Sequence, residues 1–302
     1  MTKAAPSGPL GAKGPMTATT PASFAWSLAR HECFHTCLRR YYYRYYAGPG
    51  VIQQVRDLQL RHEWAHTHIR RGAHEWLRES LEIEAAAARL LQTLRDDFRA
   101  SRQHEYRLTP KRTAGLFEHE CGIAVPDEEW KSLADRAVAD LRTFAGTAYG
   151  RELAAGPAAA RLAIGENLRF DLRGLAVDIR PDLVLKDGTG LRIHDWIQPS
   201  DVPSRGLTRA ALVWLAVEHW GAAPAGVVLV EYTFPSGPRE EYRFSEEDLE
   251  AGRELIHDSA DEMRYPLADP ERDLAREEDF DVADDERICH TCPFLRLCAR
   301  WR

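Results

Sequence analysis

The sequence predicts an α/β protein with a helical first half, a mixed sheet in the second half, and two ends that meet at a group of cysteines. Apolar residues recur at three- and four-residue steps over the first half, which is typical of helices. From Ala163 the pattern changes to alternation and β-branched runs, which favours strands. Cysteines stand near both ends, as Cys37 and as Cys289, Cys292 and Cys298.

The composition is that of a globular protein. The chain has 302 residues and is 44% hydrophobic, which is enough for a large core. A net charge of -7 excludes a basic field over the whole surface, so any nucleic-acid binding must come from a local patch. No apolar run is long enough for a membrane span or a signal peptide, and the cysteine pattern suits a reducing compartment. We therefore expect a cytoplasmic protein that does not contact a membrane.

The chain divides by composition. Residues 1–21 are rich in Pro, Gly, Ala and Thr, and we expect a disordered tail there. Residues 22–302 are expected to form a single domain. Its parts are a helical part at 22–160, an α/β core at 161–250, and a closing segment at 251–302 with a helix, an acidic loop and the cysteines.

The helices can be placed from their end signals. Ser27 suits the N-cap of a first helix of about 20 residues that stops at the Gly-Pro-Gly of positions 48–50. A second helical stretch runs from 51 to about 98. A further amphipathic helix begins at Asp127 and closes at Gly146.

Strand patterns fill the second half. They are AIGENLRFDL, LAVDIRPDLVL and LRIHDWIQ, and the turn at 186–190 joins the last two as a hairpin. The helix TRAALVWLAVEHW follows, and then the strand GVVLVEYTF, whose continuous apolar run predicts burial on both faces. A short polar helix and an acidic loop at 269–287 lead to the cysteines. The acidic run is expected to be solvated.

The cysteines can form one site only if the fold brings the ends of the chain together. Four thiolates suit an iron-sulfur cluster or a structural zinc. Cys33 and Cys37 are one helical turn apart, so spacing leaves open which of them supplies the fourth sulfur. Cys121 has no partner in this arrangement and is expected to be a small buried side chain.

Two aspartates flank the predicted hairpin. Asp182 lies near the start of one strand and Asp195 near the end of the next, so their side chains would face each other. Such hard oxygen ligands suit Mg²⁺ or Mn²⁺, which polarise a phosphate and lower the pKa of an attacking water. Aspartates at strand ends also cap turns, so the pair alone does not identify a metal site.

In this order, the motifs resemble the iron-sulfur branch of the PD-(D/E)XK nucleases, particularly RecB-like and AddB-like nuclease domains and the CRISPR-adaptation exonucleases. The resemblance rests on CLRRYYYRYY, GAHEWL, RPDLVL, an acidic residue on the next strand and CHTCPFLRLC, and covers about residues 23 to 301. It implies a restriction-endonuclease-like fold. It also implies a 4Fe-4S cluster on Cys37, Cys289, Cys292 and Cys298, because the position before Leu-Arg-Arg-Tyr-Tyr favours Cys37 over Cys33.

The resemblance further implies a divalent metal, Mg²⁺ or Mn²⁺, held by His74, Asp182 and Asp195. Glu166, on the preceding strand, matches an additional acidic position that some members use. The resemblance also implies DNA, as single strands or duplex ends, as the ligand. No phosphate-binding loop of the G-x-x-x-x-G-K-[ST] type is present, so any motor would be a partner protein, such as a helicase or a CRISPR or defence subunit.

The chain departs from the family pattern at the lysine that follows the second acid. That position is Ile197, which carries no charge and donates no hydrogen bond. Gln198 points to the opposite face of a regular strand, so it could substitute for the lysine only across a β-bulge. Lys186 stands at the distant hairpin turn. A supporting Gln and Tyr in the next helix are replaced by Ala210 and Trp214. We therefore expect lost or much reduced nuclease activity, with an active nuclease as the alternative.

Basic and aromatic residues interleave after Cys37, a mixture that can bind phosphates and stack on the bases of a single strand. The expected DNA contacts from this run and from the next helix, where Arg70 and Arg78 extend the basic face, are Arg39, Arg40, Arg44, Tyr42 and Arg71.

A metalloprotease is a remote alternative. The residues from His62 to His66 read H-E-x-x-H, in which two histidines bind zinc and the glutamate acts as general base. No third ligand motif follows, and this interpretation leaves the cysteines unexplained.

Overall fold

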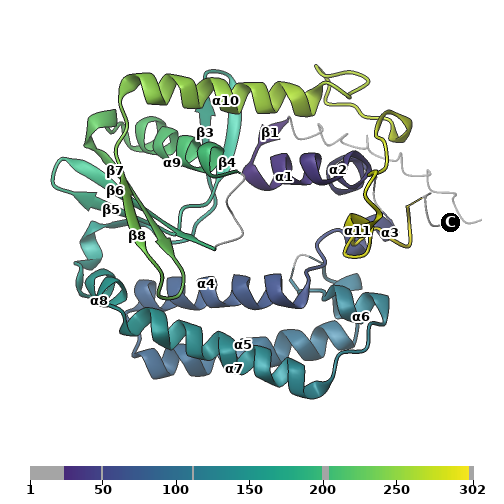
Figure 1. The fold of residues 1–302 in the computed structure, drawn as a ribbon, viewed down its shortest axis with the longest axis horizontal. Helices are drawn as coiled ribbons and strands as arrows, with labels where there is room; N and C mark the ends of the chain where they lie inside the picture. The colour runs from purple at the N-terminus through teal and green to yellow at the C-terminus, as the bar shows by residue number, and fades with distance from the viewer. Residues whose placement is uncertain (1–23, 49, 111, 199–203, 299–302) are drawn as a thin grey trace, which may run out of the picture.

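A computed structural model describes residues 24–48, 50–110, 112–198 and 204–298 (Figure 1). The predicted tail at 1–21 lies outside the described residues. The α/β fold class is confirmed, with helices over the first half and a mixed sheet in the second. No helix among the described residues has the length and apolar character needed to cross a membrane.

The helical half is built on three long helices that pack side by side (Figure 1). They are α4 (Arg61–Glu79), α5 (Ile83–Arg102) and α7 (Asp127–Gly146). The prediction of α7 is confirmed at both ends, whereas the stretch predicted from 51 to 98 is broken. The chain is extended at Leu60 and left-handed at Ser80, so α3 (Val51–Val55), α4 and α5 are separate. The shorter elements here are η1 (Glu105–Arg107), α6 (Phe117–Cys121), α8 (Ala148–Ala155) and η2 (Ala158–Ala160).

The prediction of a single helix after Ser27 is also wrong, because the helix is divided at Cys37. Ser27 caps α1 (Leu28–Thr36) as predicted, and α2 (Leu38–Tyr45) follows. Cys37 between them has an extended backbone, with φ -167° and ψ 123°. Its sulfur accepts a hydrogen bond from the backbone N of Arg40 at 3.5 Å and so acts as the N-cap of α2.

The main sheet has five strands in the order β2, β5, β6, β7, β8. The predicted hairpin is confirmed, since β5 and β6 pair antiparallel with Asp187 opposite Gly190. β6 and β7 pair in parallel through the crossover helix α9 (Arg205–Trp220), and β7 is buried along nearly its whole length, as predicted. The bounds are β2 (Arg161–Ala163), β5 (Leu183–Asp187), β6 (Gly190–Ile197), β7 (Val227–Thr233) and β8 (Arg239–Tyr242).

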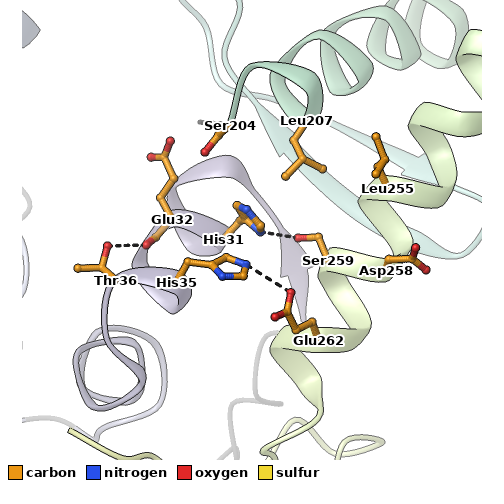
Figure 2. Close-up of a pocket in the computed structure, with 10 residues that line it drawn as sticks. All are labelled: His31, Glu32, His35, Thr36, Ser204, Leu207, Leu255, Asp258, Ser259 and Glu262. Carbon is orange, nitrogen blue, oxygen red and sulfur yellow. Dashed lines mark hydrogen bonds and ion pairs between the residues drawn. The ribbon is translucent and has the colours of Figure 1, made fainter. Parts of the chain in front are cut away.

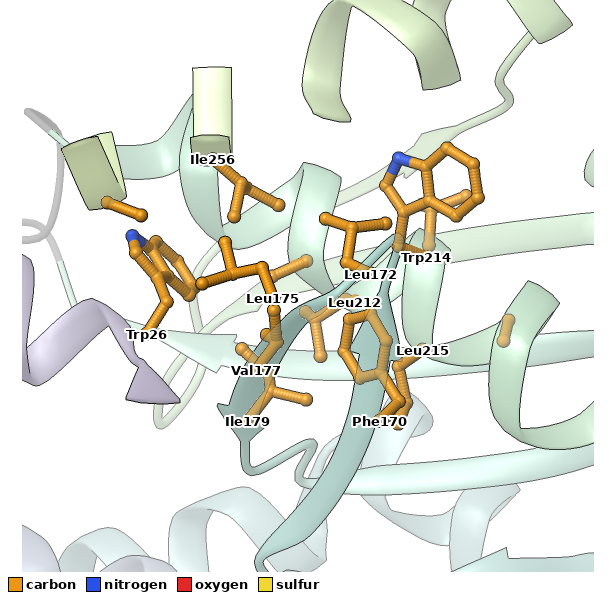
Figure 3. Close-up of a cluster of buried hydrophobic side chains, with 14 of the residues drawn as sticks. Trp26, Phe170, Leu172, Leu175, Val177, Ile179, Leu212, Trp214, Leu215 and Ile256 are labelled. Atoms are coloured by element: carbon orange, nitrogen blue, oxygen red, sulfur yellow. The ribbon is translucent and has the colours of Figure 1, made fainter. Parts of the chain in front are cut away.

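A smaller sheet, in the order β1, β4, β3, lies on the side of α9 that faces away from the main sheet. The helix α10 (Glu246–Arg264) packs against both α9 and this smaller sheet. Figure 3 shows how Trp26, Leu212 and Ile256 bring the smaller sheet, α9 and α10 into one core. The strand predicted as AIGENLRFDL is in fact two strands, because residues 164–167 form a loop. The bounds are β1 (Ala25–Trp26), β3 (Leu168–Leu172) and β4 (Leu175–Ile179).

The two faces of the main sheet contact different layers. Leu183 and Trp196 pack on the helices of the first half, whereas Val184 and Ile193 pack on the α9 side. This alternation follows from the two-residue period of a strand. The acidic ends of β5 and β6 therefore lie between α4 on one side and α9 on the other.

The segment after α10 returns to the N-terminal helices, and α11 (Glu286–Cys289) lies beside α2 and α3 (Figure 1). The acidic run is not simply solvated. Glu277, in η5 (Glu277–Asp279), accepts hydrogen bonds from Arg39 at 2.8 Å and from Tyr43 at 2.7 Å. Tyr46 donates to Asp273 at 2.9 Å. The two ends of the chain are thus joined by polar contacts.

Candidate functional site

The hairpin brings the two predicted acids together. Asp182 immediately precedes β5, and its backbone N donates to the carbonyl oxygen of His194 at 3.2 Å. Asp195 follows in β6. The two residues are only 1% and 7% exposed. Both carboxylates are therefore largely removed from water, where an unpaired charge would be costly.

His74 reaches the same point from α4. Its Nε2 lies 2.8 Å from Oδ1 of Asp182, and its ring stacks on Trp196 with centroids 5.1 Å apart. Gly165 lies against the other side of the imidazole, with φ +68°. A Cβ at this position would collide with the ring, so glycine is required both by the backbone conformation and by the close approach. The histidine is held rigidly against the acid.

Sequence reasoning placed Arg70 on a basic face but did not predict that it would contact the acids. Its Nε and Nη2 donate to the two oxygens of Asp182 at 3.1 and 2.5 Å, and its Nη2 lies 3.7 Å from Oδ1 of Asp195. The backbone N of Trp196 donates to Oδ2 of Asp182 at 2.7 Å. The helical pattern could have indicated Arg70, since it precedes His74 by one turn and shares its face.

A third acid was also missed by sequence reasoning. Glu231 in β7 stands beside Asp195 in the parallel register and is buried. Arg209 binds its two oxygens at 2.8 Å each, and Arg205 pairs with both Glu231 and Asp195, the latter at 3.4 Å. The signal in the sequence was a charged residue inside an apolar strand, because a buried charge needs a partner.

The pKa values of Asp182 and Asp195 are shifted in opposite directions. Burial disfavours charge on Asp182, but the charge of Arg70 and the contact with His74 outweigh it and hold its pKa below the usual range. Burial raises the pKa of Asp195 to about 6, and the negative charge of Asp182 adds to the rise. The pair therefore contains one firmly ionised carboxylate and one that resists ionisation.

These residues open into a cleft of about 780 Å³ between α1, α4, β4 and α9. Asp195 and His74 line it, together with the guanidinium groups of Arg70, Arg180 and Arg205. Burial lowers the pKa of Arg180, and the charges of Arg70 and Arg71 lower it further. The lining of the cleft thus mixes arginines with carboxylates, which include Glu32 and Asp178 as well as Asp195.

Ile197 occupies the family's lysine position, and its alkyl side chain carries no charge. Ile197 ends β6, where its carbonyl oxygen accepts from the backbone N of Phe234 at 3.0 Å, and Gln198 follows the strand. Lys186 pairs with Leu191 near the hairpin turn and is exposed. Within the described residues, Asp195 pairs with the guanidinium groups of Arg70 and Arg205.

Three other predicted positions have different surroundings. Glu166 is in the loop before β3 rather than on a strand, and it pairs with Arg78 at 3.3 Å. Trp214 is buried and donates to the carbonyl oxygen of Leu249 at 2.8 Å. Ala210 faces Gly252 of α10 so closely that a Cβ on the glycine would lie 2.8 Å from the alanine Cβ. Ala210 and Trp214 thus join α9 to α10.

The cysteines named from both ends line one small cavity of about 20 Å³. They are Cys37, Cys289, Cys292 and Cys298, with Arg40 and Tyr43 beside them. Burial raises the pKa of the Cys292 thiol to about 11, while the charge of Arg40 acts in the opposite direction. Cys33 packs in the core around Phe34 and Tyr41 and is absent from the lining of this cavity. Cys121 lies outside the cavity and is partly buried.

The basic and aromatic run of α2 mostly faces the protein. Arg39 donates to Glu277 and to the carbonyl oxygen of Phe280, and Arg44 pairs with Asp57 at 3.6 Å. Tyr42 packs on Phe280. These contacts satisfy side chains that were expected to bind DNA. On α4, Arg71 contacts His68 at 2.9 Å and is partly exposed.

The H-E-x-x-H residues have separate structural roles. Glu63 accepts a hydrogen bond from the backbone N of Leu60 at 3.2 Å and caps α4. His62 and His66 line two different cavities. This arrangement gives no support to a metalloprotease.

A second large cavity, of about 720 Å³, lies between α1 and α10 (Figure 2). His31 contacts Ser259 at 2.8 Å, and His35 contacts Glu262 at 3.3 Å. Two pairs of polar side chains at its wall thus join α1 to α10.

No three His, Cys, Asp or Glu side chains in the described part of the chain are placed to hold a single metal ion. The acid pair as it stands does not fit a divalent cation, because Arg70 already holds Asp182. The cysteine cavity fits an iron-sulfur cluster better in its chemistry. It offers four thiols, and Nε of Arg40 beside them is buried without a hydrogen-bond partner among the described residues.

Comparison with known proteins supplies the family. The sequence profile of the PD-(D/E)XK nuclease superfamily matches residues 25–299. No curated protein matches the chain. A solved structure titled "Crystal structure of SSO0001" aligns at 13% identity and a TM-score of 0.31, covering 62% of this chain and 80% of that one, and so weak an alignment carries no argument. The profile spans nearly all of the described fold, and the chain belongs to the PD-(D/E)XK nuclease superfamily.

Proposed function

We propose that the chain is an iron-sulfur, DNA-binding relative of the RecB-like and AddB-like nucleases whose cleavage activity is lost or much reduced. The observation that carries this proposal is Ile197 at the end of β6, two residues after Asp195. A branched alkyl group cannot orient a water molecule or stabilise charge on a phosphate. Losing one such group costs about 100-fold or more in rate.

The superfamily uses Mg²⁺ or Mn²⁺, which would polarise the scissile phosphate and lower the pKa of the attacking water. In this chain His74, Asp182 and Asp195 are the side chains in the corresponding place. Asp182 is already held by Arg70 and His74, so these residues are occupied with each other. This supports the loss of cleavage rather than its retention.

The cleft is the proposed DNA-binding surface, in place of α2. Arg180 lines it with its Nε donating to the carbonyl oxygen of Gly165 at 2.8 Å, whereas Arg70 and Arg205 beside it are bound to the acids. A guanidinium group binds phosphate through paired hydrogen bonds, so Arg180 is the proposed phosphate contact. On α2, Arg39 pairs with Glu277 and Arg44 with Asp57. DNA bound along the cleft would pass over Asp195 without meeting a catalytic lysine.

The cluster is proposed to be structural, a 4Fe-4S centre on Cys37, Cys289, Cys292 and Cys298. When bound, it would tie the closing segment to the start of α2. The break between α1 and α2 turns the Cys37 side chain into the cavity, and Arg40 places a cation beside the thiolates. A role with a helicase, CRISPR or defence partner, in the cytoplasm, remains part of the proposal.

The active-nuclease alternative is favoured by one observation, the retention of His74 beside Asp182 and Asp195. A digestion assay decides between the two. Wild type and Asp195→Ala are incubated with single-stranded and duplex DNA in Mn²⁺, and binding to the same DNA is measured by gel shift. We expect binding without cleavage by either protein. Cleavage by wild type that disappears in Asp195→Ala would establish the alternative instead.

A further inference from the structure

The guanidinium of Arg70 is a feature of the acid site that the missing lysine does not explain. A carboxylate has about four lone-pair positions. On Asp182 each is used by a protein donor: Nε2 of His74 and Nε of Arg70 at Oδ1, and Nη2 of Arg70 and the backbone N of Trp196 at Oδ2. With Asp182 only 1% exposed, its bonding capacity is filled from within the protein.

The charges lead to the same conclusion. Arg70 also lies 3.7 Å from Asp195, and Arg205 approaches that carboxylate from the other side at 3.4 Å. A divalent cation between the two acids would stand next to two guanidinium groups, and like charges repel strongly where water is excluded. The cations needed to hold the acids together are already part of the chain.

The neighbouring strand repeats the arrangement. Glu231 in β7 is bound by Arg205 and by Arg209, the latter through two hydrogen bonds of 2.8 Å. Each of the three acids on β5, β6 and β7 therefore faces at least one guanidinium group. Bidentate pairing makes these contacts specific to arginine, because lysine presents a single point charge.

We infer that Arg70 is a built-in counter-ion that takes the place of the divalent cation, so that the acid pair of this fold is held together without a metal. The inference deepens the proposed function and rests on it, since a site arranged in this way has no use for the cation in cleavage. Under this inference the contact between His74 and Asp182 serves the structure of the site and not the binding of a metal.

The chain offers a matched control in Arg71. It is the next residue of α4, but its guanidinium contacts His68 at 2.9 Å and Glu75 at 3.8 Å. Arg70→Gln removes the charge and shortens the side chain, and it leaves a polar amide in place of the guanidinium. Arg71→Gln makes the same chemical change outside the acid pair.

The test is a titration of each protein with Mn²⁺ alone, without DNA, followed by electron paramagnetic resonance and by thermal denaturation. Wild type and Arg71→Gln should show no site at the acids. Arg70→Gln should bind one Mn²⁺ at the acids. Its affinity should be about 10- to 100-fold above any Mn²⁺ affinity of wild type, which is the range that changes beside a metal site usually cause. Adding Asp195→Ala to Arg70→Gln should abolish the gain, which locates the ion.

Loss of Arg70 removes the guanidinium from Asp182 and leaves Asp195 with Arg205, so the buried acids are less well compensated. Arg70→Gln should therefore melt at a lower temperature and recover when Mn²⁺ is added. A variant that folds only in the presence of Mn²⁺ supports the inference equally. Wild type binding Mn²⁺ as tightly as Arg70→Gln, or no gain in Arg70→Gln, would overturn it. Because DNA is absent, these outcomes are independent of the digestion assay, whose failure would bear on the proposed function.

Discussion

The acid cleft and the cysteine cavity differ in how their candidate ligands are occupied. In the cleft, Asp182 and Asp195 are bound by arginines of the same chain. In the cavity, four thiols converge and the nearest cation, Arg40, keeps a buried Nε without a partner among the described residues. The difference is what the proposals above predict, with a cluster bound at the cavity and no divalent cation bound at the cleft.

The two sites also differ in what each would lose without its metal. The cavity joins the closing segment to α2, so a group bound there contributes to the folding of the whole chain. The cleft lies on α4 and on strands whose packing is complete without a cation.

The largest effect should come from Cys292→Ala. Removing one thiolate should abolish the brown colour and broad visible absorption of anaerobically purified protein. It should also destabilise the chain by several kcal/mol, because cluster binding is coupled to folding. Cys121→Ala is the control, since Cys121 lies outside the cavity. A colourless wild type that contains stoichiometric zinc would contradict the cluster.

Asp182→Ala tests the internal pairing of the cleft. The change leaves Arg70 and His74 without their shared partner, and breaking a buried pair costs about 3–5 kcal/mol. Urea denaturation measures the loss. Asp187→Ala removes an exposed carboxylate that pairs with Arg192, and it should cost no more than about 1 kcal/mol. Equal losses of stability from the two substitutions would show that the buried pairing of Asp182 contributes no more than an exposed ion pair.

Asp195→Asn should stabilise the protein at neutral pH, whereas Asp182→Ala should destabilise it. A carboxyl group with a raised pKa binds protons more readily in the folded state, so its contribution to stability falls as the pH rises from 3.8 to about 6. At about pH 7.5 the substitution should stabilise the protein by about 1–3 kcal/mol. The gain should shrink towards pH 4. Thermal denaturation over this pH range measures it, and a loss of stability at neutral pH would be the contrary result.

The smallest effect concerns DNA. Arg180→Ala should weaken binding and lower the slope of log affinity against log salt by about 1, as expected for the loss of one phosphate contact. Arg44→Ala, on α2, should leave the slope unchanged because Arg44 already pairs with Asp57. The reverse outcome would restore α2 as the DNA-binding surface.

Much of the fold could be predicted from the sequence because it depends on local rules. The two-residue period predicted the hairpin of β5 and β6, and the apolar run predicted the burial of β7. The residues at the ends of α7, Asp127 and Gly146, were sufficient to predict where that helix begins and ends. The helix breaks at Cys37 and Ser80 could not be predicted, because they depend on packing rather than on glycine or proline.

The sequence also predicted a set of candidate site residues: Asp182, Asp195, His74, the isoleucine at 197 and the four cysteines. Their partners came from the tertiary structure, because a contact between α4 and the residue before β5 leaves no spacing signal along the chain. Arg70 was expected only to extend a basic face, whereas the structure pairs its partly exposed side chain with the buried Asp182. Local sequence thus determined which side chains this protein carries, and three-dimensional packing determined which of them neutralise one another.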